Sequence, residues 1–165
     1  MTKIFCDIAD LKHISKFDKK KIVKGFTTNP SLIRKAGAKN YSNYTKKILK
    51  LTKKPVSFEV FADDEKKMIF QGNKISKWGK NVFVKVPVTN SKGKFMGNVI
   101  KTLNKKKIKL NITAVYTSRQ TKQILKKINK KTKAIIVVHF AGLSCDMDEI
   151  LKISKKHSIK VIEDC

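Results

Sequence analysis

The sequence Val82-Phe83-Val84-Lys85-Val86-Pro87 combines β-branched and aromatic residues with a single lysine and a closing proline. This composition predicts a β-strand that ends at the proline. Because side chains alternate along a strand, Phe83, Lys85 and Pro87 share one face and the three valines share the other. If both faces are covered, Lys85 is buried, and burial favours the neutral amine that attacks a carbonyl carbon. Lys85 is therefore a candidate Schiff-base lysine; the alternative is an ordinary lysine on a solvated strand edge.

Segments with this strand pattern alternate with helix-period segments along the chain. The predicted strands are 3–9, 23–28, 55–62, 82–87, 108–115, 134–140 and 160–163. The predicted helices are 10–20, 32–36, 41–53, 63–78, 93–106, 118–131 and 146–156. An alternation that repeats about every 27 residues predicts an α/β fold of parallel strands joined by right-handed crossovers.

Two parallel architectures fit such an alternation, an open doubly wound sheet and a (β/α) barrel. The chain has no glycine-rich dinucleotide fingerprint after its first predicted strand and no phosphate loop with Gly-Lys-Ser/Thr. Both observations disfavour a nucleotide-binding sheet. We therefore predict a parallel (β/α) barrel of TIM type, incomplete because 165 residues hold fewer than eight strand–helix units.

The formal net charge is +27, and the positive residues are almost all lysine, with arginine at 34 and 119 alone. The lysines are spread over every predicted helix without an aromatic-interleaved groove motif, so we predict no nucleic-acid partner. No apolar run approaches the ~20 residues of a membrane span, so we also predict no membrane partner. Cysteines 6, 145 and 165 show no paired metal spacing, which predicts a reduced, cytoplasmic protein.

Polar residues stand at or near the carboxyl ends of five successive predicted strands. They are Asp7, Asn29, Glu59, Lys85, Asn111 and Thr113. Acids and amides are depleted in strands and unfavourable to bury. A single such residue would be read as a structural polar group. Five strands in succession instead indicate a site at the carboxyl end, where barrel enzymes build their active sites.

The chemistry of this set is that of carbon–carbon bond cleavage. A neutral Lys85 attacks a ketone, and Glu59 shuttles protons through a water while the carbinolamine loses its hydroxyl. Asp7 deprotonates a substrate hydroxyl as the carbon–carbon bond breaks, and the amide and threonine side chains of the set orient hydroxyls and the water. The protonated imine is the electron sink, so we predict no metal and no other cofactor; no His, Cys and carboxylate cluster has ligand spacing.

At these positions the chain resembles the transaldolase family, in particular its short, fructose-6-phosphate aldolase-like branch. The matching strings are Phe5-Cys6-Asp7, Gly25-Phe26-Thr27-Thr28-Asn29-Pro30-Ser31-Leu32-Ile33, Ser57-Phe58-Glu59-Val60, Val84-Lys85-Val86-Pro87 and Leu110-Asn111-Ile112-Thr113. The resemblance covers about residues 1–128. It implies class I aldol chemistry in a (β/α)8 barrel, with Lys85 forming the imine and Asp7 and Glu59 as acid–base residues.

The resemblance also implies a substrate and its contacts. The substrate would be a sugar phosphate from which a dihydroxyacetone unit is transferred or released, as in the pentose phosphate pathway. Asn29, Asn111 and Thr113 would contact that substrate, and we add Thr28 beside Asn29.

The resemblance weakens beyond about residue 128. The family has an arginine that grips the substrate phosphate after Phe-x-Gly, whereas this chain has Phe140-Ala141-Gly142-Leu143. Residues 130–165 instead resemble a fragment of the sugar aminotransferases that use pyridoxal phosphate (PLP), with Asp164 matching the residue that bonds the cofactor's pyridine nitrogen. We therefore predict transaldolase-like units over 1–128 and a strand–helix–strand tail over 129–165 left by gene fusion. The alternative is a divergent transaldolase throughout.

An incomplete barrel leaves open sheet edges. We therefore expect either an unstable lone monomer or a homo-oligomer in which two chains cover each other's gaps. The leading functional prediction is transaldolase-like chemistry through Lys85. The alternatives are an inactive fusion product and a PLP-binding fragment that lacks the lysine needed for transamination.

Overall fold

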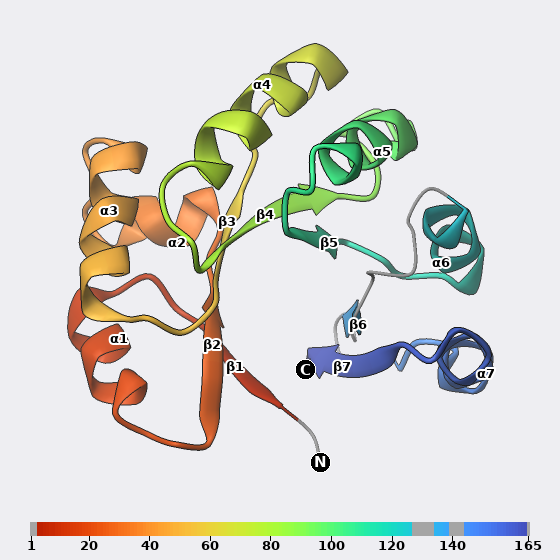
Figure 1. The fold of residues 1–165 in the computed structure, drawn as a ribbon, viewed down its shortest axis with the longest axis horizontal. Helices are drawn as coiled ribbons and strands as arrows, with labels where there is room; N and C mark the ends of the chain where they lie inside the picture. Colours follow the sequence, from red (N-terminus) through yellow and green to blue (C-terminus); the bar gives the residue numbers. More distant parts are fainter. Residues whose placement is uncertain (1–2, 127–133, 139–143, 165) are drawn as a thin grey trace.

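The structure is a computed structural model that describes residues 3–126, 134–138 and 144–164. Strands and helices alternate along it (Figure 1). The strands are β1 (Ile4–Asp7), β2 (Val23–Thr27), β3 (Val56–Glu59), β4 (Val82–Pro87), β5 (Leu110–Thr113), β6 (Ala134–Val138) and β7 (Lys160–Asp164). The helices are α1 (Leu11–Asp18), α2 (Pro30–Lys35), α3 (Tyr41–Leu51), α4 (Glu65–Ser76), α5 (Gly97–Lys105), α6 (Ser118–Leu125) and α7 (Met147–His157). The predicted segment boundary at 128 and the string 140–143 lie outside the described residues.

The first five strands form one parallel sheet in the order β1-β2-β3-β4-β5. Strands β6 and β7 form a separate parallel pair. Figure 1 shows the five-stranded sheet curling into an arc, with α1 to α5 on its outer side. A doubly wound sheet would carry helices on both faces and reverse its strand order. The predicted incomplete (β/α) barrel of TIM type is therefore confirmed.

The alternation of side chains along β4 separates the core from the inner face of the sheet. Val82, Val84 and Val86 are buried and belong to the main hydrophobic cluster, together with Met68 and Ile75 of α4. The residues between them, Phe83, Lys85 and Pro87, are half-buried. The outer face is apolar because helices cover it, and polar groups are left to the inner face.

One predicted helix begins later than expected, at Gly97 rather than at residue 93. The residues before it form a small hairpin closed by an antiparallel bridge between Thr89 and Phe95. The side-chain oxygen of Asn90 accepts hydrogen bonds from the backbone of Lys92 and Lys94, and Gly93 has a φ of 74°. These local bonds compete with the helix, and glycine adopts the left-handed conformation without strain.

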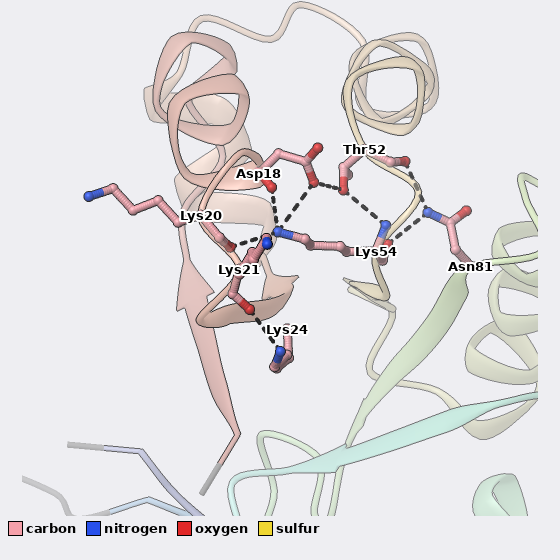
Figure 2. Close-up of polar contacts among 7 residues, drawn as sticks. All are labelled: Asp18, Lys20, Lys21, Lys24, Thr52, Lys54 and Asn81. Atoms are coloured by element: carbon pink, nitrogen blue, oxygen red, sulfur yellow. Dashed lines mark hydrogen bonds and ion pairs between the residues drawn. The ribbon is translucent and has the colours of Figure 1, made fainter.

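At the amino ends of the strands, Lys54 holds two connections together (Figure 2). Its ammonium donates to the carbonyl oxygens of Asp18 and Lys20, at the end of α1, and lies 3.9 Å from the Asp18 carboxylate. The Thr52 hydroxyl donates to the same carboxylate. Asn81 completes the cluster by donating to the carbonyl oxygens of Thr52 and Lys54. A positive charge at this point also suits the negative end of the α1 dipole.

We predict that Lys54→Met, which keeps the apolar stem and removes the ammonium, lowers the free energy of unfolding by about 1–3 kcal/mol. The reason is that two carbonyl oxygens and a carboxylate lose a charged donor. Urea unfolding followed by circular dichroism measures the change. The control is Lys53→Met at the exposed neighbouring position, where the change should stay within about 0.5 kcal/mol. Equal effects of the two substitutions would contradict the role given to Lys54.

Candidate active site

Strands β3, β4 and β5 bring three predicted residues side by side. In the sheet register, Glu59 pairs with Lys85 and Lys85 pairs with Asn111. Residues in register on neighbouring strands point to the same face, which here is the inner face near the carboxyl ends. The parallel pairing therefore assembles an acid, an amine and an amide that lie far apart in the sequence.

The amine of Lys85 is enclosed by protein groups. Its Nζ lies 3.7 Å from Oε2 of Glu59 and donates to the backbone carbonyl oxygen of Thr28 at 3.4 Å. The side chains of Lys85 and Glu59 are 14% and 19% exposed. This pair is therefore largely shielded from bulk water.

Burial raises the pKa of the Glu59 carboxyl above its ordinary value, because the charged form loses hydration. The nearby ammonium of Lys85 opposes this shift, and the negative charge of Asp7 adds to it. Glu59 is thus a carboxyl that holds a proton at higher pH than an exposed glutamate. Such a group is suited to give and take protons beside an amine.

Asp7 lies at the rim of the site, at the end of β1. Its Oδ1 accepts a hydrogen bond of 2.7 Å from the hydroxyl of Thr27, the residue opposite it on β2. The residue is exposed, in contrast to Glu59. The two carboxyl groups therefore have different environments, which is the arrangement that separates acid and base roles.

On β5 the structure places Asn111 and Thr113 on the same face of the strand, two residues apart. Asn111 is buried, and its Nδ2 donates to the hydroxyl of Ser57 at 3.1 Å. Thr113 is half-buried and pairs with Pro87, beyond Lys85 on the neighbouring strand. Both are positioned beside the lysine, with Asn111 held in orientation by β3.

Thr28 lies next to Lys85 through its backbone carbonyl oxygen, whereas the side chains of Thr28 and Asn29 bond elsewhere. The Thr28 hydroxyl is fully buried and donates to the carbonyl oxygen of Ser57. The Asn29 side chain caps α2 by accepting a hydrogen bond from the backbone of Leu32. These bonds show a structural use for both side chains, and their predicted contact with substrate stays a prediction.

Tyr41 is a site neighbour that the sequence did not indicate. Its hydroxyl donates to the carbonyl oxygen of Glu59 and accepts from the Glu59 backbone N–H, both at 3.2 Å. Burial raises the pKa of this phenol. The ring packs edge-on against Phe61. In the sequence, Tyr41 fits the amphipathic pattern of its helix. No sequence pattern near Tyr41 therefore indicates a contact with Glu59.

Thr27 and Ser57 were also not selected from the sequence as site residues, although each lies in a string that matches the transaldolase family. They hold Asp7 and Asn111 through the hydrogen bonds above. The strand period is a signal that could have indicated Ser57, because it stands two residues before Glu59 and so shares its face. Thr27 pairs with Ser57 on the neighbouring strand. Within the part of the chain that the structure describes, no three His, Cys, Asp or Glu side chains converge as metal ligands.

The fold and this site define the class of (β/α)-barrel proteins that place a lysine and carboxyl groups at the carboxyl ends of parallel strands. A family model described as transaldolase/fructose-6-phosphate aldolase matches residues 4–162. The chain belongs to this transaldolase/fructose-6-phosphate aldolase family. The family acts on sugar phosphates by aldol chemistry through a lysine, without a cofactor.

Relatives of the chain carry the same description. The probable transaldolase of Methanococcus vannielii is 34% identical over 155 residues, which are 93% of this chain and 67% of that protein. The probable transaldolases of Thermoanaerobacter sp. and Clostridium botulinum are 34% and 35% identical over 118 residues. These 118 residues are 72% of this chain and 52% of each of those two proteins. The chain thus spans between half and two thirds of the length of these relatives.

The family match also corrects the predicted extent of the resemblance. It continues to residue 162, well beyond the predicted limit at about 128. The alignment with the M. vannielii protein likewise covers 155 residues. These matches give no support to the aminotransferase resemblance of residues 130–165 and favour a transaldolase-like chain throughout.

We predict that substitutions around Glu59 move its pKa in opposite directions. Lys85→Met should raise the pKa of Glu59 further, because the ammonium that favours its charged form is lost. Asp7→Asn should lower it by a smaller amount, because a repelling charge is lost. Carbon-13 NMR titration of the Glu59 carboxyl measures both shifts. A change of the same sign in the two variants would contradict the geometry described here.

Proposed function

We propose that this chain performs transaldolase-type chemistry on a ketose phosphate, with Lys85 as the Schiff-base lysine. The observation that carries the proposal is the pair formed by Lys85 and Glu59, 3.7 Å apart and largely shielded from solvent. An amine in this position has a carboxyl within reach of one bridging water, which is what proton transfer during imine formation requires.

In the first stage, the neutral Nζ of Lys85 attacks the ketone carbon, and a proton passes from this nitrogen to the former carbonyl oxygen to give a neutral carbinolamine. Glu59 then supplies a further proton through a water, and the hydroxyl leaves as water while the nitrogen lone pair forms the protonated imine. The raised pKa of Glu59 supports this role, because the carboxyl keeps its proton up to a higher pH than an exposed glutamate does.

In the second stage, Asp7 removes the proton from a substrate hydroxyl at the rim of the site. The adjacent carbon–carbon bond breaks, its electron pair enters the protonated imine to form an enamine, and an aldehyde leaves. The enamine then attacks an acceptor aldehyde or takes a proton. In both cases water hydrolyses the resulting imine, which releases the ketone product and frees Lys85. Asn29, Thr28, Asn111 and Thr113 are the proposed substrate contacts, and Asn111 is pre-oriented by Ser57.

We predict that borohydride reduction in the presence of fructose 6-phosphate leaves a stable adduct on Lys85, located by peptide mass mapping. Lys85→Met should form no adduct at this peptide, because the attacking amine is gone. Since the chain is rich in lysine, the control is Lys12→Met, an exposed position in the first turn of α1, which should keep the Lys85 adduct. A folded wild-type chain without the adduct would overturn the proposal and favour an inactive product.

We further predict that Glu59→Gln slows adduct formation by about 10²–10⁴-fold, because an amide cannot relay the proton. Single-turnover trapping at fixed substrate concentration measures the rate. The matched control is Glu65→Gln in the first turn of α4, where the carboxylate is paired with Lys94 at 2.7 Å. The control should trap the ketose at the wild-type rate. Equal rates for wild type and Glu59→Gln would remove Glu59 from the mechanism.

A further inference from the structure

The four connections that lead from helices into strands β2 to β5 all lie at the amino ends of the strands, opposite the candidate active site. They comprise residues 19–22, 52–55, 77–81 and 106–109. The exposed lysines in these connections are Lys19, Lys20, Lys21, Lys53, Lys77, Lys80, Lys106, Lys107 and Lys109. The four connections contain no acidic residue. We call this surface the amino-end face.

The acidic residues are gathered at the other end of the sheet. Within residues 3–126 they are Asp7, Asp10, Asp18, Glu59, Asp63, Asp64 and Glu65. All but Asp18 lie at the carboxyl ends of strands or in the turns that follow them. Asp18 ends α1, and its carboxylate is occupied by Thr52 and Lys54. The amino-end face therefore has a strong positive charge without a free carboxylate among its described residues.

Aliphatic side chains are exposed on the same face. Ile22, which follows the three lysines of the first connection, is 62% exposed, and Leu51 at the end of α3 is 38% exposed. The hydrogen bond between Thr52 and Asp18 connects the ends of helices α3 and α1 (Figure 2). A basic surface with projecting aliphatic groups suits the boundary between lipid headgroups and acyl chains.

We propose that the amino-end face docks on an anionic lipid surface. Each lysine near such a surface contributes roughly 1 kcal/mol, or about a fivefold gain in partitioning. A plane of lipid headgroups can engage all four connections together, and Ile22 can enter the headgroup boundary. No helix among the described residues is long and apolar enough to cross a bilayer, so the proposed association is peripheral. It departs from the prediction, made from the sequence, that the chain has no membrane partner.

A nucleic acid fits the face less well. Its connections offer lysine point charges and no arginine, so they lack the planar fork that grips phosphate or guanine in bidentate fashion. The aromatic residue in them, Trp78, is half-buried against Phe58 and Tyr41 rather than free to stack on bases. Docking by this face would leave the candidate active site, at the opposite end of the strands, open to substrate.

The test is co-sedimentation of the full chain with vesicles of phosphatidylcholine containing 30% phosphatidylserine, at about 0.1 M salt. The triple variant Lys19→Gln, Lys20→Gln, Lys21→Gln should lose about a hundredfold in partitioning, since three lysines are removed. The matched control, Lys12→Gln, Lys66→Gln, Lys67→Gln, makes the same change of charge at exposed positions in the first turns of α1 and α4. It should bind within about threefold of wild type, since these positions lie at the opposite end.

Three further results decide the proposal. Ile22→Ser should weaken vesicle binding without changing the salt dependence, because it removes an apolar contact and no charge. Equal losses in the two triple variants would show attraction by net charge alone and overturn the proposal. Binding to duplex DNA or RNA that depends on Lys19, Lys20 and Lys21, without vesicle binding, would overturn it in favour of a nucleic acid. Circular dichroism of each variant confirms that the fold is retained.

Discussion

The structure depends on one constraint, the alternation of side chains along parallel strands that helices cover on one face only. In β4 the pleat turns Val82, Val84 and Val86 into the helix-covered core and leaves Lys85 on the inner face. The same period in β3 buries Phe58 and directs Glu59 inward. Because neighbouring strands run in register, Glu59, Lys85 and Asn111 meet without any local contact in the sequence.

Burial and hydrogen bonding give the two carboxyl groups of the site different environments. Glu59 is shielded and shifted toward the protonated form, whereas Asp7 is exposed and held by Thr27. The backbone of Glu59 is fixed in turn by the Tyr41 hydroxyl, which bonds both its carbonyl oxygen and its N–H. Helix α3 therefore contributes to the site through a tyrosine that bonds the backbone of Glu59.

The chain belongs to the transaldolase/fructose-6-phosphate aldolase family, and its strands carry a lysine, two carboxyl groups and amides at or near their carboxyl ends. Within residues 3–126, the same end of the sheet carries the acidic residues other than Asp18, while the lysine-rich connections lie at the other end. The protein is thus polarised along its strands, with the candidate chemistry at one end and the basic amino-end face at the other. This polarity would leave the candidate active site open to substrate if the amino-end face docked as proposed.

The sequence by itself determined the strand–helix alternation, the parallel fold class and the inward-facing polar residues Asp7, Glu59, Lys85, Asn111 and Thr113, because period and residue type are local properties. The tertiary structure alone decided which of these groups meet, that Asn29 caps α2, and that Tyr41 and Lys54 hold distant segments. It also decided which charges are neighbours: the lysines of four connections that are far apart in the sequence lie together at the amino ends of the strands. The physical reason is that distances between residues far apart in sequence are set by strand register and helix packing, which no local pattern encodes.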